Sequence, residues 1–451
     1  MKAIKNILSI CSVALLLGSC QADLLETKPY GNVAAGNMWT SENFADKGVT
    51  AIYSTLRKSY VGLGLYQMDC LGVSTDCRDA DYPIMRNTIT TSNGMFSSYW
   101  SEHYSGISRA NDAIVHLPEV DMPENKKARY MAEAKVLRAY FYYKLNIMYK
   151  GVPVYLEPVE ASECTKGQET EAAVWQVIED DLTAAINEPN LPNIYTEGSS
   201  DYGRVTKGLA YALRGKAYLY QKEYAKAAAD FEAVSQCGFG LFEGDYKQLF
   251  KEANEQSKEM IFSVQCIGLD GLGNDISFRY GTRSSFGSCW NTYLVNADFV
   301  ETYENADGSK FNWNDYIPGY NEMEPAARAV FFLRDGLTDA EKEAMKTAGA
   351  DMSKYLPEGN EARIKAAYAN RDPRLTASII TPYSTYDGAN GSNEYTYTLR
   401  WPFRAGDVSE PFDLKTDTNN RFYYLYRKFV AEGASEIPNR SYSPVSYTHL
   451  T

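Results

Sequence analysis

The chain has 451 residues, of which 44% are hydrophobic and 23% are charged, and this ordinary globular composition excludes an intrinsically disordered or collagen-like protein. Lysine and arginine number 45 against 58 aspartates and glutamates, so the net charge is −13 at pH 7, and repulsion from phosphate disfavours a nucleic-acid partner. The length suggests two or three lobes, which could share one core.

The first 19 residues are typical of a secretory signal peptide. Lys2 and Lys5 form a short basic region, and the mostly apolar run at residues 7–17 is too short to span a bilayer. The Leu-Gly-Ser-Cys stretch that ends at Cys20 resembles the bacterial lipobox, in which a peptidase cuts before a cysteine that carries a diacylglycerol. We therefore expect Cys20 to be the acylated first residue of the mature protein. The alternative is a plain signal peptide with a chance cysteine.

Residues 20–40 are expected to form a tether, because they are rich in small and polar residues. Acyl chains hold a protein at a membrane without burying the protein itself. After residue 20 there is no run of about eighteen apolar residues, the minimum for a bilayer-spanning helix. The mature chain is therefore expected to meet the membrane through its lipid anchor only.

Residues 41–265 are expected to form a mainly α-helical region. Apolar side chains recur at helical spacing at residues 49–56 and again at 100–117. A long helix is predicted over residues 126–150, where Gly151 ends it, and a further helix follows at about residues 175–186.

The segment after Thr206 matches much of the tetratricopeptide pattern for two antiparallel helices. It contains Tyr211-x2-Arg214-Gly215-x2-Tyr218, followed by Ala227-x3-Phe231. Small residues at Gly215 and Ala227 let the two helices approach closely, although Trp and Leu are preferred where this chain has Tyr211 and Arg214. Repeats need stacked neighbours to bury their faces, so the preceding helices are expected to pack beside this pair.

Residues 266–445 are expected to be rich in loops and short strands. Glycines and aromatic residues are frequent there, and short β-prone runs such as residues 394–400 occur. Loops carried by a rigid scaffold are a common place for a binding surface. The predicted fold class is therefore mainly α, a helical scaffold with a loop-rich C-terminal half.

Flat aromatic side chains and nearby hydrogen-bonding groups suit a sugar, whose ring has an apolar C–H face and polar edges. The candidates of this kind are Trp290, the preferred platform, with Tyr280, Arg283 and Tyr82. Core packing is the alternative for each aromatic residue.

A cluster of charged residues after the first long helix supplies two more candidate ligand residues, Asp76 and Arg78. Carboxylates bridge sugar hydroxyls or collect around calcium, but Asp69, Asp76, Asp79 and Asp81 lack the spacing of an EF-hand. A solvated acidic loop with local ion pairs is therefore favoured over a metal site.

Catalytic and cofactor-binding motifs are missing from the sequence. We find no nucleophile elbow, zinc-binding spacing, phosphate loop or dinucleotide fingerprint, and His103 and His116 are expected to be structural. Neither an enzymatic activity nor a cofactor is expected. A pair of glycosidase carboxylates stays open, because that mechanism depends on spatial separation rather than on sequence spacing.

Six cysteines remain once Cys11 leaves with the signal and Cys20 is acylated. A chain of this size does not need disulfides, and the cysteines are scattered. If one bridge forms, Cys70 to Cys77 is the first choice.

The last residues resemble a sequencing-library adapter rather than a protein terminus. Residues 445–450 spell Val-Ser-Tyr-Thr-His-Leu, as the translation of a transposon-end adapter does. We expect residues 446–451 to be non-native and the C-terminus to be truncated; a native tail of that sequence is the alternative.

Several motifs, in one order from Cys20 to about Pro444, together resemble the SusD/RagB family. They are the lipobox, Glu133-Ala134-Lys135-Val136-Leu137-Arg138-Ala139-Tyr140, Tyr149-Lys150-Gly151-Val152-Pro153, Arg204-Val205-Thr206 with its repeat, Asn305-Ala306-Asp307-Gly308 and Arg371-Asp372-Pro373-Arg374-Leu375. The resemblance implies a SusD-like fold and a surface lipoprotein of the Bacteroidota outer membrane. The chain departs from the family by stopping soon after Arg427-Lys428-Phe429, where members continue into another helix.

The resemblance further implies a protein that binds nutrient glycans or oligosaccharides and delivers them to a SusC-like TonB-dependent transporter. Its tetratricopeptide helices would face or support that partner. Two other readings stay open, a glycan-degrading surface lipoprotein and a scaffold that binds only peptide or protein.

Overall fold

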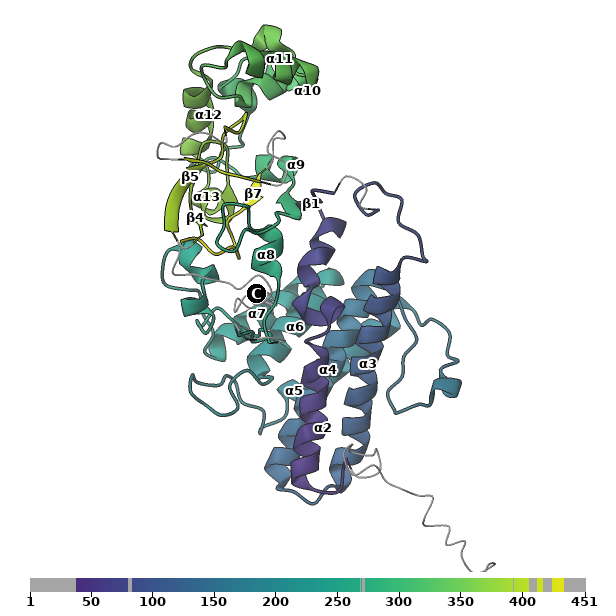
Figure 1. Cartoon of the computed structure of the whole chain (residues 1–451). Helices are drawn as coiled ribbons and strands as arrows, with labels where there is room; N and C mark the ends of the chain where they lie inside the picture. The colour runs from purple at the N-terminus through teal and green to yellow at the C-terminus, as the bar shows by residue number, and fades with distance from the viewer. Residues whose placement is uncertain are drawn as a thin grey trace, which may run out of the picture.

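The computed structural model describes residues 38–79, 83–267, 269, 272–391, 393–404, 412–416 and 424–433. These residues build a helical body, drawn mostly from the first half of the sequence, and a loop-rich body drawn mostly from the second half (Figure 1). Each body has its own hydrophobic core. The expectations for the signal peptide, Cys20, Tyr82 and residues 446–451 concern parts of the chain outside the described residues.

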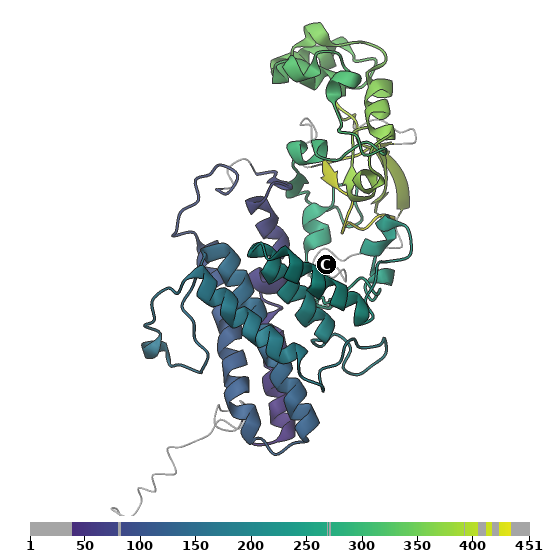
Figure 2. The ribbon, with the colours of Figure 1, turned by 180° about the vertical axis from the view of Figure 1, so that it is seen from behind.

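In the helical body, each long helix packs against the next one along the chain, as Figure 2 shows from behind. The helices are α2 (Glu42–Thr55), α3 (Gly94–His116), α4 (Glu124–Tyr149), α5 (Glu171–Ile186), α6 (Lys207–Tyr220) and α7 (Tyr224–Gln236). This arrangement confirms the predicted helical scaffold.

Helix α4 is the central element of this body, and it contacts α2, α3, α5 and α6. Its small and apolar side chains are buried on all sides, as a helix surrounded by neighbours requires. It ends where Lys150 and Gly151 adopt φ values of 55° and 109°. A Cβ atom at Gly151 would lie 2.2 Å from the carbonyl oxygen of Glu169, so only glycine fits this position.

The predicted tetratricopeptide pair is formed by α6 and α7. A Cβ atom on Gly215 would lie 2.6 Å from Cε1 of Phe231, which shows how closely the two helices approach. Arg214, where the repeat pattern prefers leucine, instead forms an ion pair with Asp230 of α7, with an Nη2 to Oδ1 distance of 2.8 Å. A salt bridge thus replaces part of the apolar contact between the helices.

The loop-rich body contains short helices and short strands, as the sequence predicts. Its helices are α8 (Ile276–Tyr280), α9 (Ala297–Glu301), α10 (Pro325–Arg328), α11 (Asp339–Thr347), α12 (Asn360–Ala369) and α13 (Pro373–Ser378). A hairpin of β4 (Thr385–Asn390) and β5 (Asn393–Thr398) is extended by β6 (Phe412–Asp413), which pairs with β5 in parallel. Strands β3 (Ile379–Ile380) and β7 (Leu425–Tyr426) form a second, antiparallel pair.

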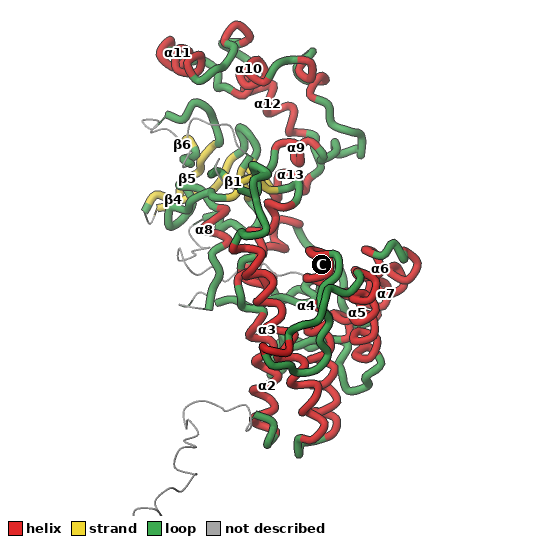
Figure 3. The backbone as a smooth tube through the Cα atoms, turned by 90° about the vertical axis from the view of Figure 1, so that its right-hand side faces the viewer, coloured by secondary structure: helices red, strands yellow, loops and turns green. Residues whose placement is uncertain are grey.

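One strand of the loop-rich body comes from the first half of the sequence. β1 (Thr75–Cys77) pairs antiparallel with β2 (Tyr293–Val295), and Asp76 lies opposite Leu294. Tyr66 and Cys70, which precede β1, belong to the same core. Figure 3 shows β1 among the other strands, above the helical body. The division at residue 265 stays a prediction.

Cys70, Cys77, Cys164, Cys237, Cys266 and Cys289 are free thiols, so the Cys70–Cys77 bridge is not formed. Burial raises the pKa of the Cys70 thiol to about 12. Within the described residues, no helix combines the length and the apolar character that a membrane crossing requires.

Candidate functional site

A pocket of about 800 Å³ lies between a loop of the loop-rich body and the β4–β5 hairpin, and we call it the hairpin pocket. Its walls come from distant segments of the chain. The described residues that line it are Arg283, Ser284, Ser285, Phe286, Gly287, Ser288, Ala389, Asn390, Gly391, Tyr395, Tyr397, Phe403, Arg404, Phe412, Asp413 and Lys415.

The loop wall is held in place by hydrogen bonds of two serines. The carbonyl oxygen of Ser284 accepts from the backbone N–H of Ala389 at 2.7 Å, and its Oγ accepts from the backbone N–H of Lys415 at 2.8 Å. Ser285 bonds to the hydroxyl of Tyr386 at 2.6 Å. The loop therefore has a fixed position before any ligand arrives.

The opposite wall approaches this loop closely at Gly388. A Cβ atom there would lie 2.1 Å from the carbonyl oxygen of Ser284. Real Cβ atoms do not come that close to backbone, so a glycine is needed for the hairpin to reach the loop.

Aromatic side chains cover one side of the hairpin pocket. Tyr395 and Tyr397 are two residues apart on β5, so their side chains lie on the same face of the strand. The ring of Phe412 packs edge-on against Tyr395, with 5.2 Å between the ring centroids. Tyr395 and Phe412 are partly exposed, which leaves apolar ring surface open to the pocket.

The charged lining is ordered by ion pairs. Asp413 is 4% exposed and accepts hydrogen bonds from Arg334, from Nε of Arg400 at 2.6 Å and from the backbone N–H of Arg404 at 2.8 Å. The Arg404 side chain binds both carboxylate oxygens of Glu341, at 2.8 and 2.9 Å. Hydrogen bonds from Arg404 and Thr338 lower the pKa of Glu341 to about 2.

Trp290 lies two residues beyond the pocket wall and is 39% exposed. Its indole packs against Phe278, with 4.9 Å between the ring centroids, and the guanidinium carbon of Arg279 lies 5.6 Å from the indole centroid. Nη1 of Arg78 donates to the carbonyl oxygen of Trp290 at 2.7 Å. We call Trp290, Phe278, Arg279 and Arg78 the Trp290 shelf.

The other candidates from the sequence lie in different places. Tyr280 is 2% exposed and stacks on Tyr426, with 4.1 Å between the ring centroids. It lines a smaller cavity of about 230 Å³ together with Asp69 and Lys428. The two carboxylate oxygens of Asp76 accept from Nδ2 of Asn296 at 3.1 and 3.2 Å.

The structure therefore brings Trp290 and Arg78 together, places Arg283 in the hairpin pocket and buries Tyr280 in the core. The roles of Trp290, Arg283, Tyr280, Asp76 and Arg78 in binding stay predictions, and Tyr82 lies outside the described residues.

The pocket residues Tyr395, Tyr397, Phe412 and Lys415 were not among the residues singled out from the sequence. A signal for the first two was present, because the strand predicted at residues 394–400 places residues 395 and 397 on one face. Nothing in the sequence indicated that this face would meet the loop that begins at Arg283.

His103 is buried, and burial lowers its pKa to about 3, so its imidazole is neutral at physiological pH. Within the described residues, no group of three histidine, cysteine, aspartate or glutamate side chains is placed to hold a metal ion.

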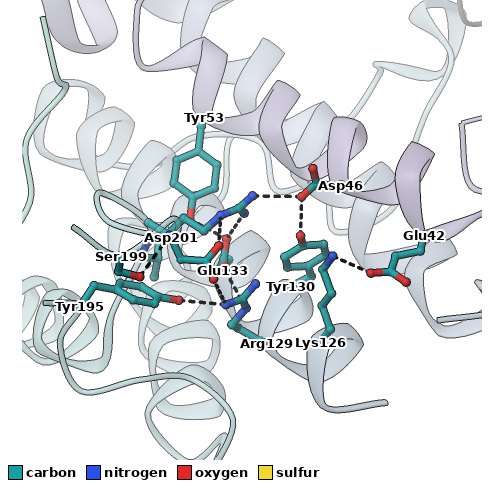
Figure 4. Close-up of polar contacts among 12 residues, drawn as sticks. Glu42, Asp46, Tyr53, Lys126, Arg129, Tyr130, Glu133, Tyr195, Ser199 and Asp201 are labelled. Carbon is teal, nitrogen blue, oxygen red and sulfur yellow. Dashed lines mark hydrogen bonds and ion pairs between the residues drawn. The ribbon is translucent and has the colours of Figure 1, made fainter. Parts of the chain in front are cut away.

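A second polar cluster has Glu133 of α4 at its centre and lies inside the helical body (Figure 4). Glu133 is fully buried and contacts Arg204, the hydroxyl of Tyr53 at 2.7 Å and Nε of Arg129 at 3.5 Å. Arg204 also pairs with Asp46 of α2 at 3.0 Å. These contacts tie α2, α4 and the segment before α6 together, which is a structural role.

Two family models cover most of the chain. One, described as "Starch-binding associating with outer membrane", matches residues 25–219, and the other, described as "SusD family", matches residues 258–448.

Three similar proteins agree with this assignment. A SusD-like protein of Bacteroides ovatus is 24% identical over 338 residues, which are 70% of this chain and 60% of that protein. The chain thus spans about 60% of the length of this curated relative. A crystal structure of a SusD-like carbohydrate-binding protein from Bacteroides fragilis superposes with a TM-score of 0.64 at 21% identity, over 91% of this chain and 71% of that one. A laminarin-binding SusD-like protein superposes with a TM-score of 0.57 at 23% identity, over 91% of this chain and 77% of that one.

Proposed function

The chain belongs to the SusD/RagB family, and on this basis we propose that it binds glycans or oligosaccharides at the hairpin pocket and the Trp290 shelf, without cleaving them. The observation that carries the proposal is the pocket itself, which is lined by partly exposed aromatic rings, such as those of Tyr395 and Phe412, and by polar side chains. Aromatic faces stack on the C–H face of a sugar, and polar groups bind its hydroxyls.

The similar proteins support the same ligand class. One of them is described as carbohydrate-binding and another as laminarin-binding. The pocket volume of about 800 Å³ is in the range of ligand pockets and has room for a short oligosaccharide. We therefore favour an oligosaccharide over a single sugar ring.

We further propose that the mature protein is held at the outer membrane through acylated Cys20 and hands its ligand to a SusC-like TonB-dependent transporter. The lipobox in the sequence and the description of the first family model support this placement. Modest affinity suits this role, because the ligand must leave for the transporter.

The function is tested with the Cys20→Ser chain, which is not acylated, against a panel of neutral and acidic oligosaccharides by calorimetry. Released sugars are assayed in the same samples. Saturable binding without release supports the proposal. Release of shorter sugars would show a glycan-degrading enzyme, and absence of binding to every member of the panel would favour a peptide ligand or a scaffold.

The anchor and the partner need separate experiments. Membrane fractionation of cells that express the chain with Cys20 or with Cys20→Ser tests the anchor, and loss of the protein from the membrane fraction is expected only for the variant. Co-purification of the acylated protein with a SusC-like TonB-dependent transporter tests the partner, and recovery of the protein alone would argue against delivery.

A further inference from the structure

The charges that line the hairpin pocket contrast with the rest of the chain. The whole chain carries a net charge of −13. The described lining residues include three basic side chains, Arg283, Arg404 and Lys415, against one acidic side chain, Asp413. Arg404 is paired with Glu341, which is not among these lining residues, so Arg283 and Lys415 supply the positive charge of the pocket. A basic pocket in an acidic protein attracts anions and leaves most of the surface repelling them.

The single carboxylate of the lining, that of Asp413, does not offset these charges, because arginine side chains outside the pocket already pair with it. Asp413 is buried and binds the side chains of Arg334 and Arg400, neither of which lines the pocket. Its remaining hydrogen bond comes from the backbone N–H of Arg404. The Asp413 carboxylate is therefore already paired and does not offset the charge of Lys415.

Lys415 is the basic residue most available to a ligand. Its side chain is exposed, and within the described residues its ammonium makes no ion pair and no hydrogen bond. Its backbone is fixed by the hydrogen bond to Oγ of Ser284, in the loop that carries Arg283. Arg283 is partly buried, and its Nη1 lies 3.4 Å from the carbonyl oxygen of Ser288. Lys415 and Arg283 thus belong to one fixed wall.

We propose that the hairpin pocket selects anionic oligosaccharides, whose carboxylate or sulfate groups bind near Lys415 and Arg283 while their sugar rings stack on Tyr395 and Phe412. This inference rests on the proposed glycan-binding function and adds the chemical class of the glycan. Uronate and sulfate groups share the property that matters here, a fixed negative charge on a sugar ring with oxygens that accept charged hydrogen bonds.

The test compares charged ligands with neutral counterparts that have the same rings and linkages. Trigalacturonate and its fully methyl-esterified form are one such pair, and a carrageenan oligosaccharide and its desulfated form provide a sulfated and a neutral arm. We expect at least one acid form to bind the Cys20→Ser chain roughly tenfold more tightly than its neutral counterpart, and the difference to shrink as salt is raised from about 50 to 500 mM. The arm that shows the difference identifies the anionic group.

A substitution separates the pocket from the protein's overall charge. Lys415→Gln is expected to weaken binding of the acid form roughly fivefold and binding of the neutral form by less. Lys226→Gln, at an exposed lysine of α7 in the helical body, removes the same charge elsewhere and is expected to change neither. Both lysines are exposed, so both variants are expected to fold.

Equal or tighter binding of the neutral ligands would overturn the charge inference and leave the glycan-binding function standing. An equal effect of Lys415→Gln and Lys226→Gln would also overturn it, because the preference would then not reside in the pocket. Absence of binding to all four ligands and to the wider oligosaccharide panel would overturn the proposed function together with the inference.

Discussion

The Oε2 atom of Glu133 lies 3.0 Å from Nη1 of Arg204, and the carboxylate side of this pair is fully buried. Glu133 opens the Glu-Ala-Lys motif of α4, and Arg204 opens the Arg-Val-Thr motif before α6, so two of the motifs that identify the family meet in one ion pair. Their role is to join helices rather than to contact a ligand.

Arg204→Ala is therefore expected to destabilise the fold by about 3 kcal/mol at pH 7, because it leaves a buried carboxylate with Arg129 as its one remaining cationic contact within the described residues. Adding Glu133→Gln to Arg204→Ala removes the unpaired charge and is expected to recover part of the loss. Urea denaturation of the single and double variants measures both effects. Equal stability of Arg204→Ala and the parent chain would contradict a structural role for the pair.

The same variant has a predictable pH dependence. Burial raises the pKa of Glu133, and Arg204 opposes that rise, so Arg204→Ala leaves the folded-state pKa further above the unfolded-state value. An acid with a raised folded-state pKa loses stability as the pH rises through that pKa, because the folded protein then holds a proton that the unfolded chain releases. The stability deficit of Arg204→Ala is expected to be small at about pH 4 and to grow towards pH 7. A deficit that is constant with pH would exclude this origin.

Glu341→Gln tests the ion pair that fixes Arg404 at the hairpin pocket. Hydrogen bonds from Arg404 and Thr338 lower the pKa of Glu341 to about 2. The ionised carboxylate therefore stabilises the fold at pH values above the unfolded-state pKa of about 4.5. This contribution is lost as the pH falls towards 2. Arg404 is partly exposed, and solvent screening limits the expected loss to about 0.5–1 kcal/mol at pH 7. Denaturation curves of the variant and the parent chain are expected to converge as the pH falls from about 5 to 2.

Gly388→Ala tests the close approach that shapes the hairpin pocket. The new Cβ atom would meet the backbone oxygen of Ser284 at 2.1 Å, and backbone cannot move aside cheaply, so we expect a loss of about 1–3 kcal/mol and weaker oligosaccharide binding. Gly94→Ala is the matched control, because no atom outside its own stretch of helix and its chain neighbours lies within 4 Å of the new methyl group. Thermal melts and calorimetry of both variants measure the effects. Normal binding by Gly388→Ala would place the ligand elsewhere.

Trp290→Ala tests the shelf. Since the indole is 39% exposed, its removal is expected to change the melting temperature little and to weaken oligosaccharide binding by about 1 kcal/mol, the scale of an aromatic contact. Trp100→Ala, at a tryptophan of α3 that is 36% exposed, is the control in the helical body. Equal affinities of the two variants would remove the shelf from the binding surface.

Local patterns predicted the helical body well, because its helices contact their neighbours in the sequence. The predicted helix at residues 126–150 differs from α4 by only a few residues at its start and one at its end. The family motifs from Arg204 to Leu375 indicated the fold because they contain residues whose buried contacts hold it together. Arg371, for example, is buried and donates to the carbonyl oxygens of Val300 and Tyr303.

The site was harder to predict, because each aromatic residue can either pack in the core or lie open at a binding surface. Tyr280 and Trp290 are ten residues apart and look equally suitable in the sequence, but Tyr280 is enclosed by Tyr66, Tyr293 and Tyr426 while Trp290 keeps an open face. Two of these neighbours, Tyr66 and Tyr426, are more than 100 residues away from Tyr280 in the sequence. The basic character of the hairpin pocket likewise appears only when Arg283 and Lys415 are brought together by folding.

The pairing of β1 with β2 sets an order of events during folding. The helices α2 to α7 pack on sequence neighbours, so the helical body can collapse as soon as its own residues are available. Thr75 must wait for Val295, which is made 220 residues later, before the loop-rich body can close. Until then Tyr66 and Cys70 lack the partners that bury them. The segment at residues 66–77 is therefore buried later than the helices, and amides of β1 are expected to gain protection from hydrogen exchange later than those of α4.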